Sequence, residues 1–88
     1  MKQISYSREA TRSLRKIPQN WKMRIIEKIE QYAENPESLA NNVIRMKGES
    51  YYRLRVGDYR IIFDESDTVI GIIKIDSRGA VYINERRK

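Results

Sequence analysis

The sequence predicts an α+β fold in which an N-terminal strand and a helical hairpin pack on a mainly antiparallel β-sheet. Two observations predict it. Apolar residues recur at helical spacing between residues 7 and 35, and three segments rich in β-branched and aromatic residues follow residue 50. At 88 residues the chain has room for one hydrophobic core, so we expect residues 1–88 to form a single domain.

The helical part begins after a short strand. Residues 2–6 alternate in polarity, and Ser7 stands where the N-cap of a helix is expected. The helix over residues 7–16 carries basic side chains on its polar faces, namely Arg8, Arg12, Arg15 and Lys16. Pro18 suits the first turn of a second helix, which Asn35-Pro36 ends. The predicted buried stripe of this second helix consists of Trp21, Ile25, Ile29 and Tyr32 or Ala33.

The sheet is predicted from residues 51–56, 59–65 and 68–76. These segments are separated by the turn-forming pairs Gly57-Asp58 and Ser66-Asp67, so we expect an antiparallel meander whose edge the N-terminal strand can join. Residues 36–50 are polar and irregular, and we expect no regular element there.

The charge balance indicates a polyanionic ligand. Eighteen lysines and arginines stand against twelve acidic residues, a formal net charge of +6. RNA, DNA and an acidic protein all fit this charge, and so does simple solubility. The absence of cysteine excludes disulfides and thiolate zinc sites, and the apolar runs are too short for a membrane span or a signal peptide. We therefore expect a cytoplasmic protein.

A basic cluster is predicted on one face of the sheet. Because strand side chains alternate, Arg53 and Arg55 point away from the side on which Leu54 lies. Arg60 opens the next strand, and the hairpin brings it near Arg55. Guanidinium groups bind phosphates in a bidentate manner, so this face suits a nucleic-acid backbone. The alternative is an exposed face whose charges are balanced by Glu49, Asp58 and Asp64.

The string Tyr-Arg-Leu-Arg-Val-Gly-Asp-Tyr-Arg over residues 52–60 resembles the RelE/ParE toxin superfamily, the toxin components of type II toxin-antitoxin systems. Lys47-Gly48 and the spacing of Arg78 and Tyr82 support the resemblance, which covers nearly the whole chain and favours the RelE-like branch. The superfamily contains both ribosome-dependent messenger RNA endonucleases and gyrase inhibitors on one fold.

For a nuclease, the resemblance implies a metal-independent and cofactor-independent reaction in the ribosomal A site. A ribose 2′-hydroxyl attacks the neighbouring phosphate while positive side chains stabilise the developing charge. The catalytic residues that the resemblance implies are Arg60, Arg78 and Tyr82. The RNA-binding and phosphate-binding residues that we expect are Lys47, Arg53, Arg55 and Lys74.

Two departures from the family pattern concern proton transfer. Family nucleases often carry lysines at the positions of Arg53 and Arg55, and arginine holds its proton more firmly than lysine. Many members have Gly-His where this chain has Asp76-Ser77, and the chain contains no histidine. The remaining candidate proton carriers are Tyr82, Asp58, Asp64 and Asp76, and the sequence does not single out one of them.

Three functions therefore remain open, led by an endoribonuclease toxin that inhibits translation. The missing histidine and lysines favour a gyrase inhibitor, and a non-catalytic RNA-binding regulator would use the same arginines without chemistry. Either toxin function implies a heteromeric complex with a cognate antitoxin, whose acidic or amphipathic segment would cover the basic face and the helical hairpin. For the nuclease, the ribosome and messenger RNA are further partners.

Overall fold

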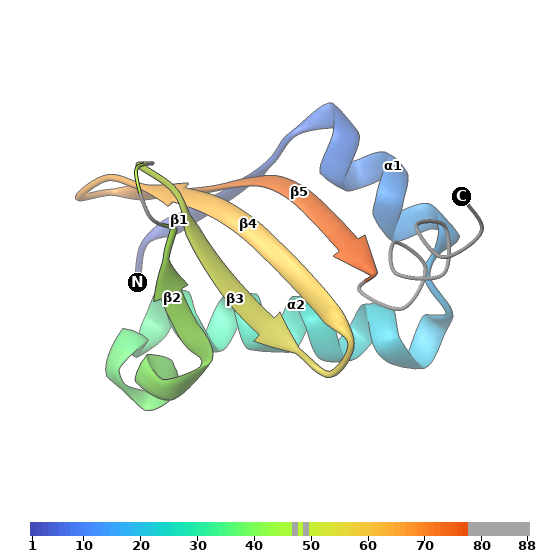
Figure 1. The fold of residues 1–88 in the computed structure, drawn as a ribbon, viewed down its shortest axis with the longest axis horizontal. Helices are drawn as coiled ribbons and strands as arrows, with labels where there is room; N and C mark the ends of the chain where they lie inside the picture. The colour runs from blue at the N-terminus through green and yellow to red at the C-terminus, as the bar shows by residue number, and fades with distance from the viewer. Residues whose placement is uncertain (47, 49, 78–88) are drawn as a thin grey trace.

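A five-stranded sheet with two α-helices against it forms the fold (Figure 1). The structure is a computed structural model that describes residues 1–46, 48 and 50–77. The elements are β1 (Gln3–Tyr6), α1 (Arg8–Lys16), α2 (Gln19–Glu34), the 3-10 helix η1 (Pro36–Asn42), β2 (Val43–Arg45), β3 (Tyr52–Val56), β4 (Tyr59–Glu65) and β5 (Val69–Ser77). No helix within these described ranges is long and apolar enough to cross a membrane.

The strands lie in the order β1-β5-β4-β3-β2. Strands β3 to β5 pair antiparallel, as the predicted meander requires, and β2 pairs antiparallel to β3. Strand β1 joins the other edge by pairing parallel to β5. A parallel neighbour needs a long crossover connection, and the two helices form part of it. The mixed α+β fold predicted from the sequence is confirmed.

Helix α1 is fixed at its first turn by Ser7, as predicted. The Ser7 hydroxyl accepts a hydrogen bond of 3.0 Å from the Ala10 amide and donates one of 2.6 Å to the Ile73 carbonyl of β5. The same side chain therefore caps the helix and attaches it to the sheet. Ala10, on the inner side of α1, is completely buried.

Helix α2 passes behind the sheet in Figure 1 and supplies most of the helical side of the core. Of the predicted stripe, Ile25, Ile29, Tyr32 and Ala33 are buried, whereas Trp21 is only partly buried near the start of the helix. The sheet contributes Leu54, Val56, Ile61, Phe63, Ile70, Ile72 and Ile75 from a single face. We call this the covered face.

The prediction for residues 36–50 was wrong in one respect, because η1 and β2 form there. Leu39 of η1 is buried, and Val43 of β2 lies opposite Leu54. A strand of three residues is too short to show alternation, and it forms because β3 offers a free edge to pair with. The loop between β4 and β5 is also longer than predicted, since β5 begins at Val69.

Candidate nucleic-acid interface

The sheet face opposite the core carries the predicted arginines, and we call it the open face. Arg55 of β3 lies directly opposite Arg60 of β4, as the hairpin predicted, and Arg60 lies opposite Asp76 of β5. Side chains that are directly opposite have Cβ atoms about 4.5–5.5 Å apart. Arg55, Arg60 and Asp76 therefore form one continuous row across three strands, which we call the Arg60 row.

A second row lies beside the first and is half apolar. Arg53 is opposite Ile44 on one side and Ile62 on the other, and Ile62 is opposite Lys74. Ile44 exposes 52% of its surface, which is high for isoleucine in a sheet. The open face therefore presents apolar surface next to the guanidinium groups, a feature that the sequence analysis missed.

The arginines of the open face are available for a ligand. Arg55 is exposed and Arg53 and Arg60 are partly exposed, and none of the three has an ion-pair partner among the residues that the structure describes. Lys74 differs from them, because its Nζ lies 3.7 Å from Oδ2 of Asp76. Its charge is thus partly offset, which weakens the expectation that it binds phosphate.

The turn that joins Arg55 to Arg60 is held in place by α2. Gly57 adopts a φ of 58°, and a Cβ atom at this position would overlap the ring of Trp21. The Trp21 ring also packs on Tyr59, with centroids 5.7 Å apart, and the guanidinium of Arg24 lies 5.0 Å from its centre. The partly buried Trp21 is therefore a platform for the hairpin turn.

Comparison with known families decides the family of this chain. The family described as ParE toxin of type II toxin-antitoxin system, parDE, matches residues 4–82. The chain belongs to this toxin family. The match covers every described helix and strand except Gln3, the first residue of β1, and it places the chain in the RelE/ParE toxin superfamily.

Solved structures of the superfamily share the fold of this toxin-family chain. The archaeal RelE-RelB complex from Pyrococcus horikoshii OT3 matches with 27% identity and a TM-score of 0.73, over 89% of this chain and 96% of that one. The RelB-RelE antitoxin-toxin complex from Methanococcus jannaschii matches with 26% identity and a TM-score of 0.70, over 91% and 96%. A mutant of the E. coli toxin RelE in the free state, at 18% identity, has a TM-score of 0.72 over 96% and 90%. No protein with a curated description matches the chain.

The sequence-predicted site residues of this toxin-family chain fall into two groups. The structure brings together Arg53, Arg55, Arg60 and Lys74 on the open face. Lys47, Arg78 and Tyr82 lie outside the described residues. The roles assigned to all seven stay predictions.

Tyr6 and Tyr32 have a raised pKa, and neither of them is suited to act as a general base. Burial, and to a smaller extent the Glu30 carboxylate, raises the pKa of Tyr6. Burial also raises the pKa of Tyr32, whose hydroxyl donates a hydrogen bond of 2.7 Å to Oε1 of Glu65. Both tyrosines therefore stay protonated at neutral pH, and both pack with the core and not on the open face.

Proposed function

We propose that this chain is the toxin of a type II toxin-antitoxin system and acts as a ribosome-dependent endoribonuclease that cuts messenger RNA and inhibits translation. The observation that carries the proposal is the direct pairing of Arg55 with Arg60 on the open face, with Arg53 beside them. Like charges placed opposite each other destabilise a sheet, so their presence needs a reason other than folding. A phosphodiester of RNA supplies that reason.

The proposed reaction follows from this arrangement. A phosphate held between Arg55 and Arg60 gains negative charge when the neighbouring 2′-hydroxyl attacks it, and two guanidinium groups stabilise that charge without accepting a proton. The apolar surface of Ile44 and Ile62 beside Arg53 suits a base of the same nucleotide. Arg78 and Tyr82 are proposed to complete the site from the C-terminal segment.

The test uses purified toxin, ribosomes programmed with a defined messenger RNA, and mapping of 5′ ends. The wild type is expected to cut within the codon in the A site. Arg55→Gln/Arg60→Gln is expected to lower the cleavage rate by about 100-fold or more, as the loss of preorganised donors does in other enzymes. Arg12→Gln/Arg15→Gln, on exposed positions of α1, removes the same charge and is the matched control. An intact transcript with the wild type would refute the nuclease.

A gyrase inhibitor is the second candidate, and the family match to the ParE toxin favours it. The arginines at positions 53 and 55, which are poor proton acceptors, favour it as well. On this alternative the open face binds a protein or DNA surface and catalyses nothing. A supercoiling assay with purified gyrase decides between the two, because a nuclease leaves supercoiling unchanged at saturating toxin.

We also propose a cognate antitoxin as the partner of this chain in the cytoplasm. Two of the similar structures are complexes of RelE with RelB, and the open face here is basic and uncovered by the described helices. An acidic antitoxin segment laid over Arg53, Arg55 and Arg60 would neutralise them and block RNA. Native mass spectrometry after co-expression with the neighbouring gene is expected to give a heteromer. Free monomer alone would contradict this.

A further inference from the structure

The proposed cleavage needs a group that removes the proton of the attacking hydroxyl, and the three arginines are unsuited to it. The sequence leaves three carboxylates of the described residues as candidates for this role, namely Asp58, Asp64 and Asp76. Their positions relative to the Arg55–Arg60 pair differ greatly. Their positions in the structure therefore distinguish one candidate base from the other two, which the sequence alone does not do.

We propose that Asp76 accepts the proton of the attacking 2′-hydroxyl, an inference that rests on the proposed nuclease function. Asp76 is the β5 member of the Arg60 row, directly opposite Arg60. The Cβ atoms of Arg60 and Asp76, as directly opposite residues, are expected to lie about 5 Å apart, so Asp76 is the next side chain of the row beyond the two arginines that hold the phosphate. On this proposal, the ribose next to the phosphate that Arg55 and Arg60 hold lies over β5, on the side of Asp76.

One oxygen of Asp76 lies near the Lys74 ammonium, and the other has no described partner. Oδ2 lies 3.7 Å from Nζ of Lys74, while Oδ1 has no hydrogen-bond or ion-pair partner among the described residues. The side chain exposes 29% of its surface, so it is sheltered but open to a ligand. The role of Lys74 is then to orient this carboxylate, in place of the phosphate contact expected from the sequence.

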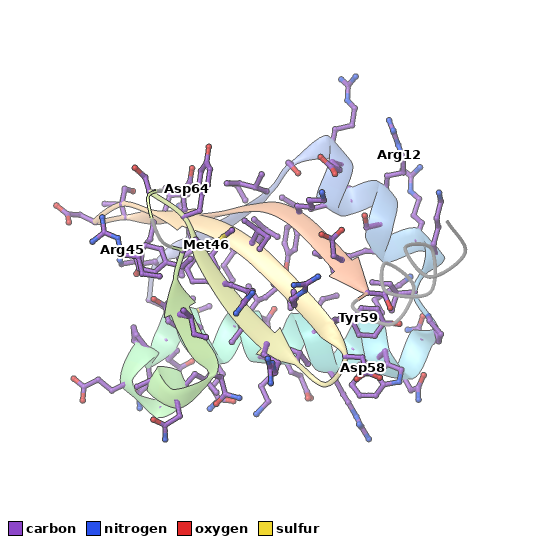
Figure 2. The ribbon with its side chains drawn as sticks, in the orientation of Figure 1. Arg12, Arg45, Met46, Asp58, Tyr59 and Asp64 are labelled. Carbon is purple, nitrogen blue, oxygen red and sulfur yellow. The ribbon has the colours of Figure 1, made fainter. Side chains whose placement is uncertain are left out.

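The other two carboxylates are badly placed for the same task. Figure 2 shows Asp58 at the β3–β4 turn and Asp64 at the opposite end of β4. Asp58 lies outside the paired strands and is exposed. Asp64 lies four residues along β4 from Arg60, a separation of about 13 Å, and its side chain crosses Gly71 towards β1.

The step balances without any further reactant. The proton passes from the 2′-oxygen to Oδ1 of Asp76, the 2′-oxygen forms a bond to phosphorus, and the bond from phosphorus to the 5′-oxygen breaks. The leaving 5′-oxygen takes a proton from solvent, and Asp76 returns its proton to solvent. The products are a 2′,3′-cyclic phosphate and a 5′-hydroxyl end, and no atom is oxidised or reduced.

The experiment measures single-turnover cleavage of ribosome-bound messenger RNA by wild type, Asp76→Asn and Asp64→Asn. Asp76→Asn is expected to lose about 100-fold or more in rate, the usual contribution of a general base. It is expected to keep its affinity, within about 3-fold, for a complex whose messenger RNA is 2′-deoxy at the scissile nucleotide. Asp64→Asn removes the same charge from the same face and is expected to cleave like the wild type.

The possible outcomes distinguish a failure of the role of Asp76 from a failure of the proposed nuclease function. If the wild type does not cut, the nuclease function fails and the inference fails with it. If the wild type and Asp76→Asn cut equally, the nuclease stands and the role of Asp76 is refuted. Loss of cleavage together with loss of binding would also refute it, because the carboxylate would then be structural. Asp76→Glu, which keeps a carboxylate, is expected to recover part of the activity, and a Glu variant as inactive as Asn would overturn the proposal.

Discussion

The two faces of the sheet are built from the same strands and differ completely. Leu54, Ile61 and Ile75 form a row across β3, β4 and β5 on the covered face, and at most 4% of any of them is exposed. The Arg60 row begins one residue further along β3 and carries two arginines and an aspartate on the open face. Stability therefore resides on one side of the sheet, which leaves the other side free to hold charges that folding alone would disfavour.

The sharpest test of this division compares two neighbouring isoleucines of β4. Ile61 is completely buried on the covered face and Ile62 is only partly buried on the open face. Ile61→Ala is expected to lower the free energy of unfolding by about 2–5 kcal/mol, because it leaves a cavity in the core. Ile62→Ala is expected to cost less than half as much. Equal losses in urea unfolding would show that both faces carry stability.

The turn between β3 and β4 gives the next largest effect. Gly57→Ala places a Cβ atom against Trp21 at a positive φ, and a loss of about 2–4 kcal/mol is expected from strain and overpacking together. Gly48→Ala is the matched control, since its φ is 76° but its Cβ atom would meet open space. It is expected to cost about 1 kcal/mol, from backbone strain alone. Thermal unfolding of both variants measures the difference, and equal losses would remove Trp21 as the support of the turn.

The hydrogen bond between Tyr32 and Glu65 is expected to make a smaller contribution to the free energy of unfolding, and this contribution depends on pH. Tyr32→Phe removes the hydrogen bond to Glu65, which Lys2 also contacts at 2.5 Å, and is expected to cost about 1 kcal/mol at pH 7. The pKa of Tyr32 is raised in the folded state, so the unfolded chain releases this proton first as pH rises. The contribution is complete below the ordinary tyrosine pKa and is lost above it.

Urea unfolding at neutral pH and above the ordinary tyrosine pKa checks this sign. The wild type is expected to lose more stability than Tyr32→Phe over that interval. Some loss remains in the variant, because the pKa of Tyr6 is shifted in the same direction. A variant that loses as much as the wild type would mean that Tyr32 releases its proton equally in both states.

The smallest effect is expected on the open face itself. Arg55→Gln relieves the repulsion with Arg60, so the free energy of unfolding is expected to rise by up to about 0.5 kcal/mol. The gain is expected to disappear at high salt, which screens the repulsion. Urea midpoints at low and high ionic strength measure it. A loss above about 1 kcal/mol would place Arg55 among the residues that stabilise the fold.

Most of the fold was predictable because its elements are marked locally. Ser7, Asn35 and Gly57 stand where a helix begins, a helix ends and a hairpin turns, and apolar spacing identifies what lies between. Strand β2 was not predictable, since three residues acquire their structure from the edge of β3. The parallel pairing of β1 with β5 likewise depends on where the helices return the chain.

The arginines of the site were predictable from the sequence, but the neighbours that depend on the register between β4 and β5 were not. Alternation placed Arg53 and Arg55 on one face, and the two-residue turn placed Arg60 beside them. The position of Asp76 depends on the pairing of β4 with β5, which an irregularity between Ile62 and Phe63 shifts by one residue. Such a shift has no signal in the sequence, so the carboxylate in the Arg60 row had to come from the structure.

The position of β5 between β1 and β4 also orders the assembly of the molecule. During synthesis β1 and both helices leave the ribosome first, but β1 has no partner until β5 follows. Pairing over so long a stretch of chain is slow to form, because the intervening loop must close first. The Arg60 row likewise needs Asp76 near the end of β5. The Arg60 row is therefore completed only when β5 pairs with β4, and a nascent chain that ends before Val69 carries its two arginines without Asp76.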